Sequence, residues 1–128
     1  MKPQVLTGSV AREQFIDEGC HIRELSNSEH DPGLSIAQAR LQPGLTTRWH
    51  RLHDTVERYC IISGEGVVEV GDLEPQTVTP GDVVVIPALY RQRITNTGTD
   101  DLVFLAICSP RFEFENYEDV DDTPGSAA

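Results

Sequence analysis

The residues most able to do chemistry lie in one short stretch of the chain. His50, His53 and Glu57 follow one another closely. Imidazole nitrogens and carboxylate oxygens are the usual protein ligands of Fe(II), Mn(II), Ni(II) and Zn(II). Without a metal, a buried imidazole and a buried carboxylate can act as general acid and base. The stretch therefore predicts a site in which His50 and Glu57 are catalytic, through a bound divalent metal ion or by direct proton transfer.

Strand alternation is the property that could bring these groups together. Residues two apart in a β-strand share a face, so His50 should point the same way as Arg48 and Leu52. After a turn, Glu57 and Tyr59 should share one face of the next strand. We expect both faces to line the interior of the fold.

A later strand adds an amide to the predicted site. Tyr90 and Gln92 should share a face, and Gln92 would then converge with His50 and Glu57 on one interior point. A glutamine carbonyl oxygen is a weaker, uncharged metal ligand than a carboxylate. His53 is one residue out of the alternation, so it is either a fourth ligand on a bulged strand or a surface turn residue.

Arginines near the histidines suggest the charge of a ligand. Arg40 and Arg48 would suit a carboxylate, because guanidinium pairs with carboxylate through two hydrogen bonds. We expect both to bind substrate, with Tyr59 and Tyr90 as further substrate-binding residues. The alternative interpretation is that each arginine is an ordinary solvated charge, or that Arg48 is simply the partner of Glu57.

Composition narrows the class of protein. The 128 residues carry a formal net charge of −11, which argues against a nucleic-acid-binding protein. No apolar run reaches the roughly 18–20 residues of a membrane span, and the first residues lack the apolar core of a signal peptide. We expect a cytoplasmic protein. Cys20, Cys60 and Cys108 are odd in number and far apart, which indicates reduced buried thiols.

The rest of the pattern predicts an all-β domain. Residues 1–19 read as a lead-in with a possible short helix near 11–17, residues 20–110 as a barrel, and residues 111–128 as an acidic tail with a frayed end. Short β-like segments separated by Gly, Pro, Asp and Asn turns indicate a sandwich or closed barrel. The expected strands are 21–25, 34–41, 46–52, 57–62, 66–70, 76–78, 83–86, 91–96 and 102–108.

The spacing of these residues resembles the two sequence motifs of the cupin superfamily, G-x5-H-x-H-x3–4-E-x6-G and G-x5-P-x-G-x2-H-x3-N. The matching positions are Gly44, His50, Glu57 and Gly64 in the first motif, and Gly81, Pro87 and Asn96 in the second. Two positions depart from the motifs and reduce the number of histidine ligands. Leu52 stands at the second histidine of the first motif, and Gln92 stands at the histidine of the second.

The resemblance implies a single-domain cupin-type β-barrel, also called a double-stranded β-helix or jelly roll. The wider chain also resembles small bacterial cupins described as mannose-6-phosphate-isomerase-like. Such a resemblance implies a divalent metal (Fe, Mn, Ni or Zn), a homodimer, and a small-molecule ligand rather than a nucleic acid or membrane. Fold alone does not define the reaction.

Three functions follow from these observations. The first is a metal-binding enzyme that acts on a small polar or anionic metabolite inside the barrel, as an oxygenase, isomerase or lyase. The second is a non-catalytic binding or sensing protein that uses the same pocket. The third is a mainly structural dimer. The retained His50 and Glu57 favour the enzyme, whereas the thinned ligand set favours the sensor.

Overall fold

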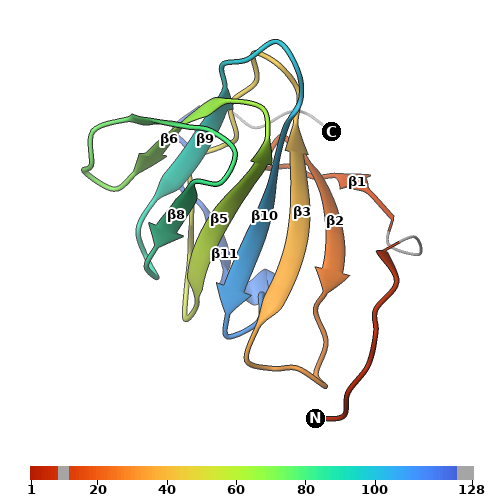
Figure 1. Ribbon diagram of the computed structural model, residues 1–128. Helices are drawn as coiled ribbons and strands as arrows, with labels where there is room; N and C mark the ends of the chain where they lie inside the picture. The colour runs from red at the N-terminus through yellow and green to blue at the C-terminus, as the bar shows by residue number, and fades with distance from the viewer. Residues whose placement is uncertain (9–11, 124–128) are drawn as a thin grey trace.

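The computed structural model describes residues 1–8 and 12–123. Its regular secondary structure is almost entirely β, in two antiparallel sheets that enclose an interior (Figure 1). One sheet has six strands in the order β1-β2-β3-β10-β5-β8, and the other has five in the order β11-β4-β9-β6-β7. In chain order the elements are β1 (Gln14–Phe15), β2 (His21–Ser26), β3 (Ser35–Leu41), β4 (His50–Leu52), β5 (Val56–Ser63), β6 (Gly66–Val70), β7 (Gln76–Val78), β8 (Val83–Ile86), β9 (Gln92–Asn96), β10 (Leu102–Ser109), the 3-10 helix η2 (Phe114–Asn116) and β11 (Tyr117–Asp119).

The predicted all-β jelly roll is confirmed, and so are most of its strands. The strands expected at 66–70, 76–78 and 83–86 have those bounds. In β6 and β9, buried residues alternate with partly exposed ones, as strands with one face on the interior require. The strand expected at 46–52 begins only at His50. Thr46 forms a single isolated bridge to Thr95, and the backbone N–H of Arg48 donates to Glu18 O at 2.9 Å.

The interior between the sheets is apolar and closely packed. Tyr59 and Phe104 hold their ring centroids 4.5 Å apart, and Leu41, Ile94 and Leu102 have no exposed surface. Burial of such side chains is the main stabilising contribution to a domain of this size. At the tight turn after β5, Gly64 has a φ of 87°, and a Cβ there would lie 2.6 Å from the carbonyl oxygen of Asp101. Only glycine fits that position.

Segments near both ends of the described chain pair with the two sheets. The helix expected near 11–17 is absent from the described part of that range, where β1 instead pairs with β2, and Ala11 lies outside the described residues. At the other end, β11 pairs with β4 and covers its free edge. The Asp121 carboxylate accepts the backbone N–H of Trp49 at 2.8 Å. The end predicted to fray, residues 124–128, lies outside the described residues.

No helix among residues 1–8 and 12–123 is long and apolar enough to cross a membrane.

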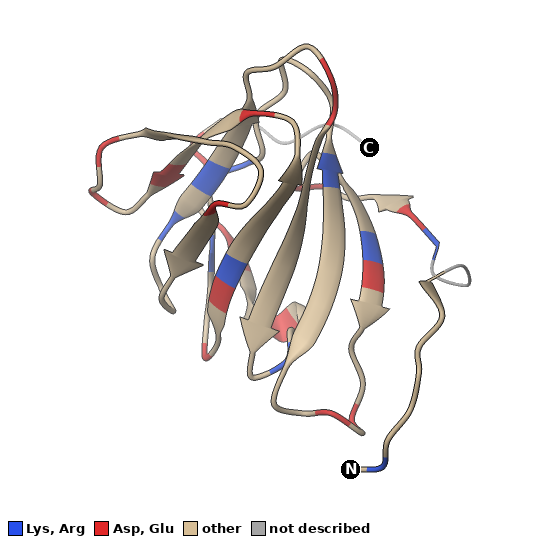
Figure 2. Cartoon of the chain, in the orientation of Figure 1, with Lys and Arg blue, Asp and Glu red and all other residues tan. Residues whose placement is uncertain are grey.

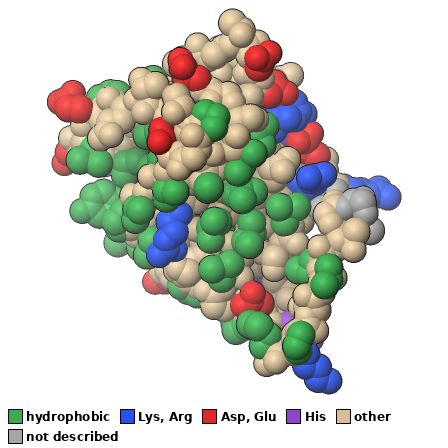
Figure 3. Space-filling view, in the orientation of Figure 1, with side chains coloured by type: hydrophobic (Ala, Val, Ile, Leu, Met, Phe, Trp, Pro, Cys, Tyr) green, Lys and Arg blue, Asp and Glu red, His purple; other side chains and the backbone are tan. Residues whose placement is uncertain are grey.

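The outer surface of the six-stranded sheet carries an apolar face. Strands β8 and β10 contain no charged residue (Figure 2). Leu105 pairs with Cys60 and Cys60 with Val83, so outward-facing apolar side chains adjoin across three strands. Val83 and Val85, on the edge strand β8, are 58% and 59% exposed. Figure 3 shows the resulting cluster of hydrophobic side chains on this side of the molecule.

The homodimer expected from the sequence remains a prediction, and this face is where we expect it to form. Contiguous exposed apolar surface on an open sheet edge favours association. The double variant Val83→Glu, Val85→Glu should be a monomer in analytical ultracentrifugation, while the unmodified chain should be a dimer. Leu45→Glu, which alters an apolar residue 41% exposed in the turn between β3 and β4, is the control and should stay dimeric. A monomeric unmodified chain at micromolar concentration would refute the expectation.

Candidate active site

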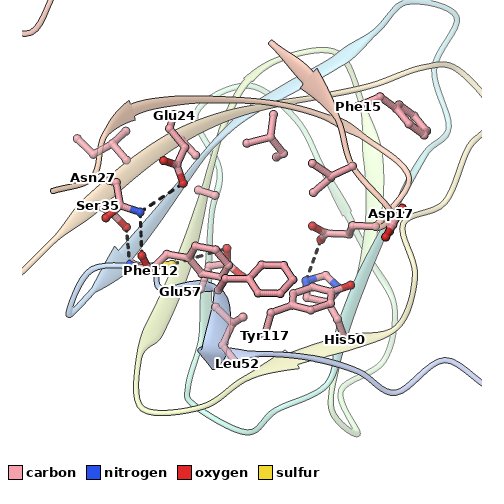
Figure 4. Close-up of a pocket in the computed structure, with 18 residues that line it drawn as sticks. Phe15, Asp17, Glu24, Asn27, Ser35, His50, Leu52, Glu57, Phe112 and Tyr117 are labelled. Atoms are coloured by element: carbon pink, nitrogen blue, oxygen red, sulfur yellow. Dashed lines mark hydrogen bonds and ion pairs between the residues drawn. The ribbon is translucent and has the colours of Figure 1, made fainter. Parts of the chain in front are cut away.

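A cavity of about 420 Å³ opens between the two sheets, and the segments around Phe15 and Tyr117 form part of its wall (Figure 4). This volume suits a small metabolite. Its walls are mostly apolar, with a few polar groups. The lining residues are Phe15, Ile16, Asp17, Glu18, Ile22, Glu24, Asn27, Ser35, Ile36, Ala37, His50, Leu52, Glu57, Ala106, Cys108, Phe112, Phe114 and Tyr117.

His50 is brought to the cavity by β4, and Glu57 by β5 in the opposite sheet. The connection between β4 and β5 crosses from one sheet to the other, so the two side chains reach the cavity from opposing walls. Inside each strand the predicted alternation holds, because Leu52 is buried with His50 and Tyr59 with Glu57. The structure therefore brings together the two residues that the sequence analysis identified as catalytic.

Both ring nitrogens of His50 face acceptor oxygens. Nδ1 lies 2.7 Å from the carbonyl oxygen of Arg48, and Nε2 lies 2.9 Å from Oε1 of Glu18. The side chains of His50 and Glu18 are only 3% and 14% exposed. Two acceptors require two protons on the ring, so His50 is an imidazolium. Burial by itself lowers the pKa of His50, but the charge and hydrogen bond of Glu18, with the charge of Glu57, outweigh burial and raise this pKa to about 9.

Tyr117 covers His50 from the C-terminal segment. The two rings stack with centroids 5.4 Å apart and an interplanar angle of 20° (Figure 4). Pairing of β11 with β4 sets this position, because Tyr117 lies opposite Leu52 in the register. Burial and the nearby carboxylate of Glu18 raise the pKa of Tyr117 well above its ordinary value, so its phenol stays neutral and can donate a hydrogen bond.

Glu57 is a buried carboxyl with one unused oxygen. Its Oε2 accepts a weak hydrogen bond from the Cys108 thiol at 3.9 Å, whereas Oε1 has no hydrogen-bond partner among the described residues. Burial raises the pKa of Glu57 and His50 lowers it, and the balance is a pKa of about 7. Glu57 can therefore exist in both protonation states near neutral pH.

Gln92 and Tyr59 lie behind this carboxyl and do not line the cavity. The Tyr59 hydroxyl donates to the carbonyl oxygen of the Gln92 side chain. The remaining Gln92 amide nitrogen has no hydrogen-bond partner in the described part of the chain, and the Gln92 side chain favours the charged form of Glu57 by lowering its pKa. Gln92 thus approaches Glu57, but its oxygen is directed to Tyr59.

Two other predicted site residues are turned away from the cavity. His53 lies in the turn after β4, where Asp54 has a φ of 62°, and its Nε2 is 2.7 Å from Oε1 of Glu118. The inward bulge required for His53 to be a ligand is not formed. Tyr90 precedes β9 in a turn, so strand alternation does not apply to it, and its ring packs 2.8 Å from where a Cβ on Gly71 would lie.

The structure does not bring the two predicted substrate-binding arginines to the cavity either. Arg40 pairs with Glu13 at 2.7 Å and with Asp101 at 3.0 Å. Arg48 precedes β4 and pairs with Asp119 at 2.6 Å. These carboxylate partners lie in three distant places: Glu13 in the N-terminal segment, Asp101 in the turn before β10, and Asp119 in β11. None of these pairings follows from local sequence.

Several site residues had no signal in the sequence. Glu18 and Tyr117 come from the segments interpreted as lead-in and acidic tail, and only the long-range pairing places them beside His50. Glu24 lines the cavity together with Ile22, although it is the one exposed residue of β2 and the burial of that strand does not alternate.

The predicted metal site does not fit the side chains as they lie. Both nitrogens of His50 are engaged, the Gln92 oxygen accepts from Tyr59, and His53 lies outside. In residues 1–8 and 12–123 no group of three or more His, Cys, Asp or Glu side chains could hold a metal ion. A divalent-metal site needs several converging, unengaged donors, and of the four predicted ligands only Glu57 supplies one.

The sequence and the fold both have known relatives. The family described as "Cupin domain" matches residues 37–108. An uncharacterized protein of Methanocaldococcus jannaschii is 31% identical over 103 residues, covering 79% of this chain and 82% of that protein. The glucose-6-phosphate isomerase of Thermococcus onnurineus is 30% identical over 95 residues, covering 65% of this chain, which spans 50% of that enzyme. The solved structure of Streptomyces PAC13 with uridine, a protein described as a nucleoside dehydratase, has a TM-score of 0.77 at 16% identity and covers 94% of this chain and 93% of its own.

The engaged donors predict weak metal binding. Protein produced without a histidine tag should contain much less than one equivalent of iron, manganese, nickel or zinc by plasma mass spectrometry. Added chelator should leave its melting temperature unchanged, because no metal contributes to the folded state. A stoichiometric metal that is lost in both His50→Ala and Glu57→Ala would contradict this prediction.

Burial of Glu57 predicts a pH-dependent cost in stability. Its pKa is raised from 4.5 to about 7 on folding, so the folded chain binds more protons and stability falls as the pH rises through this interval. Glu57→Gln removes the charge and should raise the free energy of unfolding above pH 7 by about 2–3 kcal/mol, with no gain below pH 4.5. Urea denaturation across this range measures the difference. Glu65→Gln, at an exposed turn, is the control, and an equal gain at all pH values would count against the argument.

Proposed function

The chain belongs to the cupin family, and from the side chains of its pocket we propose that it is an enzyme that carries out acid–base chemistry on a small polar metabolite, of the lyase or isomerase type. The observation that carries the proposal is Glu57, a buried carboxyl that lines a pocket-sized cavity, has a raised pKa, and has one oxygen without a hydrogen-bond partner among the described residues. A group tuned to titrate near neutral pH is characteristic of catalytic sites.

Glu57 is suited to move a proton to or from the substrate. With a pKa of about 7 it is both an effective base when ionised and an effective acid when protonated at neutral pH. Its proposed role is to take a proton from a carbon next to a carbonyl or hydroxyl group of the substrate. In an isomerisation the same proton returns to a neighbouring carbon.

His50 supplies a fixed positive charge on the opposing wall. An imidazolium beside the reacting group stabilises negative charge that develops on a substrate oxygen. A substrate oxygen at Nε2 would take the place of the Glu18 carboxylate, which now occupies that position at 2.9 Å. In an elimination the proton removed from carbon goes to Glu57, and the leaving hydroxyl receives a proton from His50 and departs as water. The neutral Tyr117 phenol offers a further hydrogen bond.

The alternative function, a non-catalytic binding protein, does not account for the cost of this arrangement. A buried carboxyl oxygen without a partner destabilises the fold, and a binding site gains nothing from it. Two relatives are named as an isomerase and a dehydratase, and both reaction types depend on proton transfer. These names support the proposed reaction class and leave the substrate open.

Hydrogen exchange into D₂O tests the proposal without knowledge of the full reaction. The protein is incubated with a panel of hydroxylated aldehydes and ketones, and NMR measures deuterium incorporation. At least one compound should gain deuterium at the carbon next to its carbonyl group. Glu57→Gln should slow this exchange about 10²–10⁴-fold, whereas Glu65→Gln should match the unmodified enzyme. The rate should rise with pH through about 7 as Glu57 ionises and fall through about 9 as His50 loses its proton. Exchange that survives Glu57→Gln, or no exchange with any compound, would refute the proposal.

A further inference from the structure

The charged side chains around the cavity indicate which charge its ligand has, a question that the proposed reaction leaves open. The carboxylates of the lining are Asp17, Glu18, Glu24 and Glu57, its one histidine is His50, and its other titratable residues are Cys108 and Tyr117, which are neutral. Among the described residues that line it, none is a lysine or an arginine. The single cation, His50, already holds Glu18 at 2.9 Å. A carboxylate or phosphate placed here would face repulsion from surrounding carboxylates and receive no guanidinium or ammonium in return.

Arg40 and Arg111 are already paired with other side chains, and Arg23, between the lining residues Ile22 and Glu24 on β2, does not itself line the cavity. Arg40 is bound by Glu13 and Asp101. Arg111 donates to Asn27 Oδ1 at 3.0 Å and to Glu113 at 3.0 Å, outside the lining. A negatively charged ligand would therefore find no arginine in the cavity wall, and would have to break existing ion pairs to recruit Arg40 or Arg111.

Glu24 forms a second polar end of the cavity. Figure 4 shows Glu24 and Asn27 on one side of the open space, and His50 with Tyr117 on the other. Asn27 Nδ2 donates to Phe112 O at 2.8 Å and to Glu24 Oε1 at 3.3 Å. These bonds orient the Glu24 carboxylate, and its other oxygen, Oε2, has no partner in the part of the chain that the structure describes. A carboxylate oxygen only accepts hydrogen bonds.

We infer that the cavity selects an uncharged, hydroxyl-bearing ligand, and that Glu24 determines this specificity by accepting a hydroxyl at the end opposite His50. The inference rests on the proposed function because it concerns the same pocket. Ile22, Ile36 and Ala106 line the cavity as apolar wall, so the ligand is polar at both ends and makes apolar contacts in between. The ligand class differs from that of the archaeal isomerases, whose name specifies a phosphorylated sugar.

Matched pairs of compounds test this inference on the full chain. Isothermal calorimetry at millimolar ligand compares glucose with glucuronate and glucose-6-phosphate, and uridine with its monophosphate. The uncharged member of at least one set should bind about tenfold more tightly than its anionic counterparts. Glu24→Gln should weaken the uncharged compound, and Glu24→Arg should reverse the preference toward the anion. Glu65→Arg makes the same change of charge on an exposed turn and should keep the original preference. Circular dichroism verifies that each variant is folded.

The outcomes separate this inference from the proposed function. Equal or tighter binding of the anionic compounds, no binding of any uncharged compound, or a preference unchanged in both folded Glu24 variants would overturn the ligand assignment. An anionic compound whose hydrogen exchange needs Glu57 would refute the ligand class and leave the acid–base function intact. An uncharged compound that binds through Glu24 but shows no Glu57-dependent exchange would support the ligand class and refute the function.

Discussion

The ion pair between Glu18 and His50 is the contact on which the site depends. Its 2.9 Å bond joins the N-terminal segment to β4 inside the fold, where both side chains are nearly excluded from water. A buried imidazolium would be costly without a carboxylate at this distance. With Glu18 present, His50 is charged, its charge limits how far burial raises the pKa of Glu57, and the segment that carries Glu18 becomes a wall of the cavity.

The site stores unfavourable interactions that the rest of the domain offsets. Glu57 Oε1 and the Gln92 amide nitrogen are buried without partners among the described residues, whereas the apolar interior includes the fully buried Leu41, Ile94 and Leu102. Each buried polar atom without a partner destabilises the fold, and burial of the apolar core offsets this destabilisation. The same carboxyl would titrate like a surface glutamate if its wall were opened to water, so the reactivity and the instability of Glu57 have one physical origin.

This chain has the barrel of the cupin family, but its site residues differ from those of the cupin sequence motifs. The glycines, the proline and Asn96 keep the turns and strand spacing, while Leu52 and Gln92 replace imidazoles at positions that face inward. Gln92 then bonds to Tyr59, and His50 turns to Glu18. Of these two interior positions only Gln92 stays polar, and the chemistry that we propose rests on Glu57 and on residues from segments near both chain ends. This division agrees with the general separation of fold from function.

Sequence by itself determined what depends on local geometry. The turns, most strand bounds, the inward direction of His50 and Glu57, and the all-β class follow from alternation and from Gly, Pro and Asn turns, which act over a few residues, whereas the cupin-type barrel was implied by the motif resemblance. Tertiary structure alone decided the partners. Arg40 and Arg48 point to carboxylates in distant segments, His53 and Tyr90 lie in turns where alternation fails, and Glu18 and Tyr117 reach His50 only because β11 and the segment after β1 pack onto β4. Side-chain pairing between remote segments depends on which strands become neighbours, and no local pattern encodes that choice.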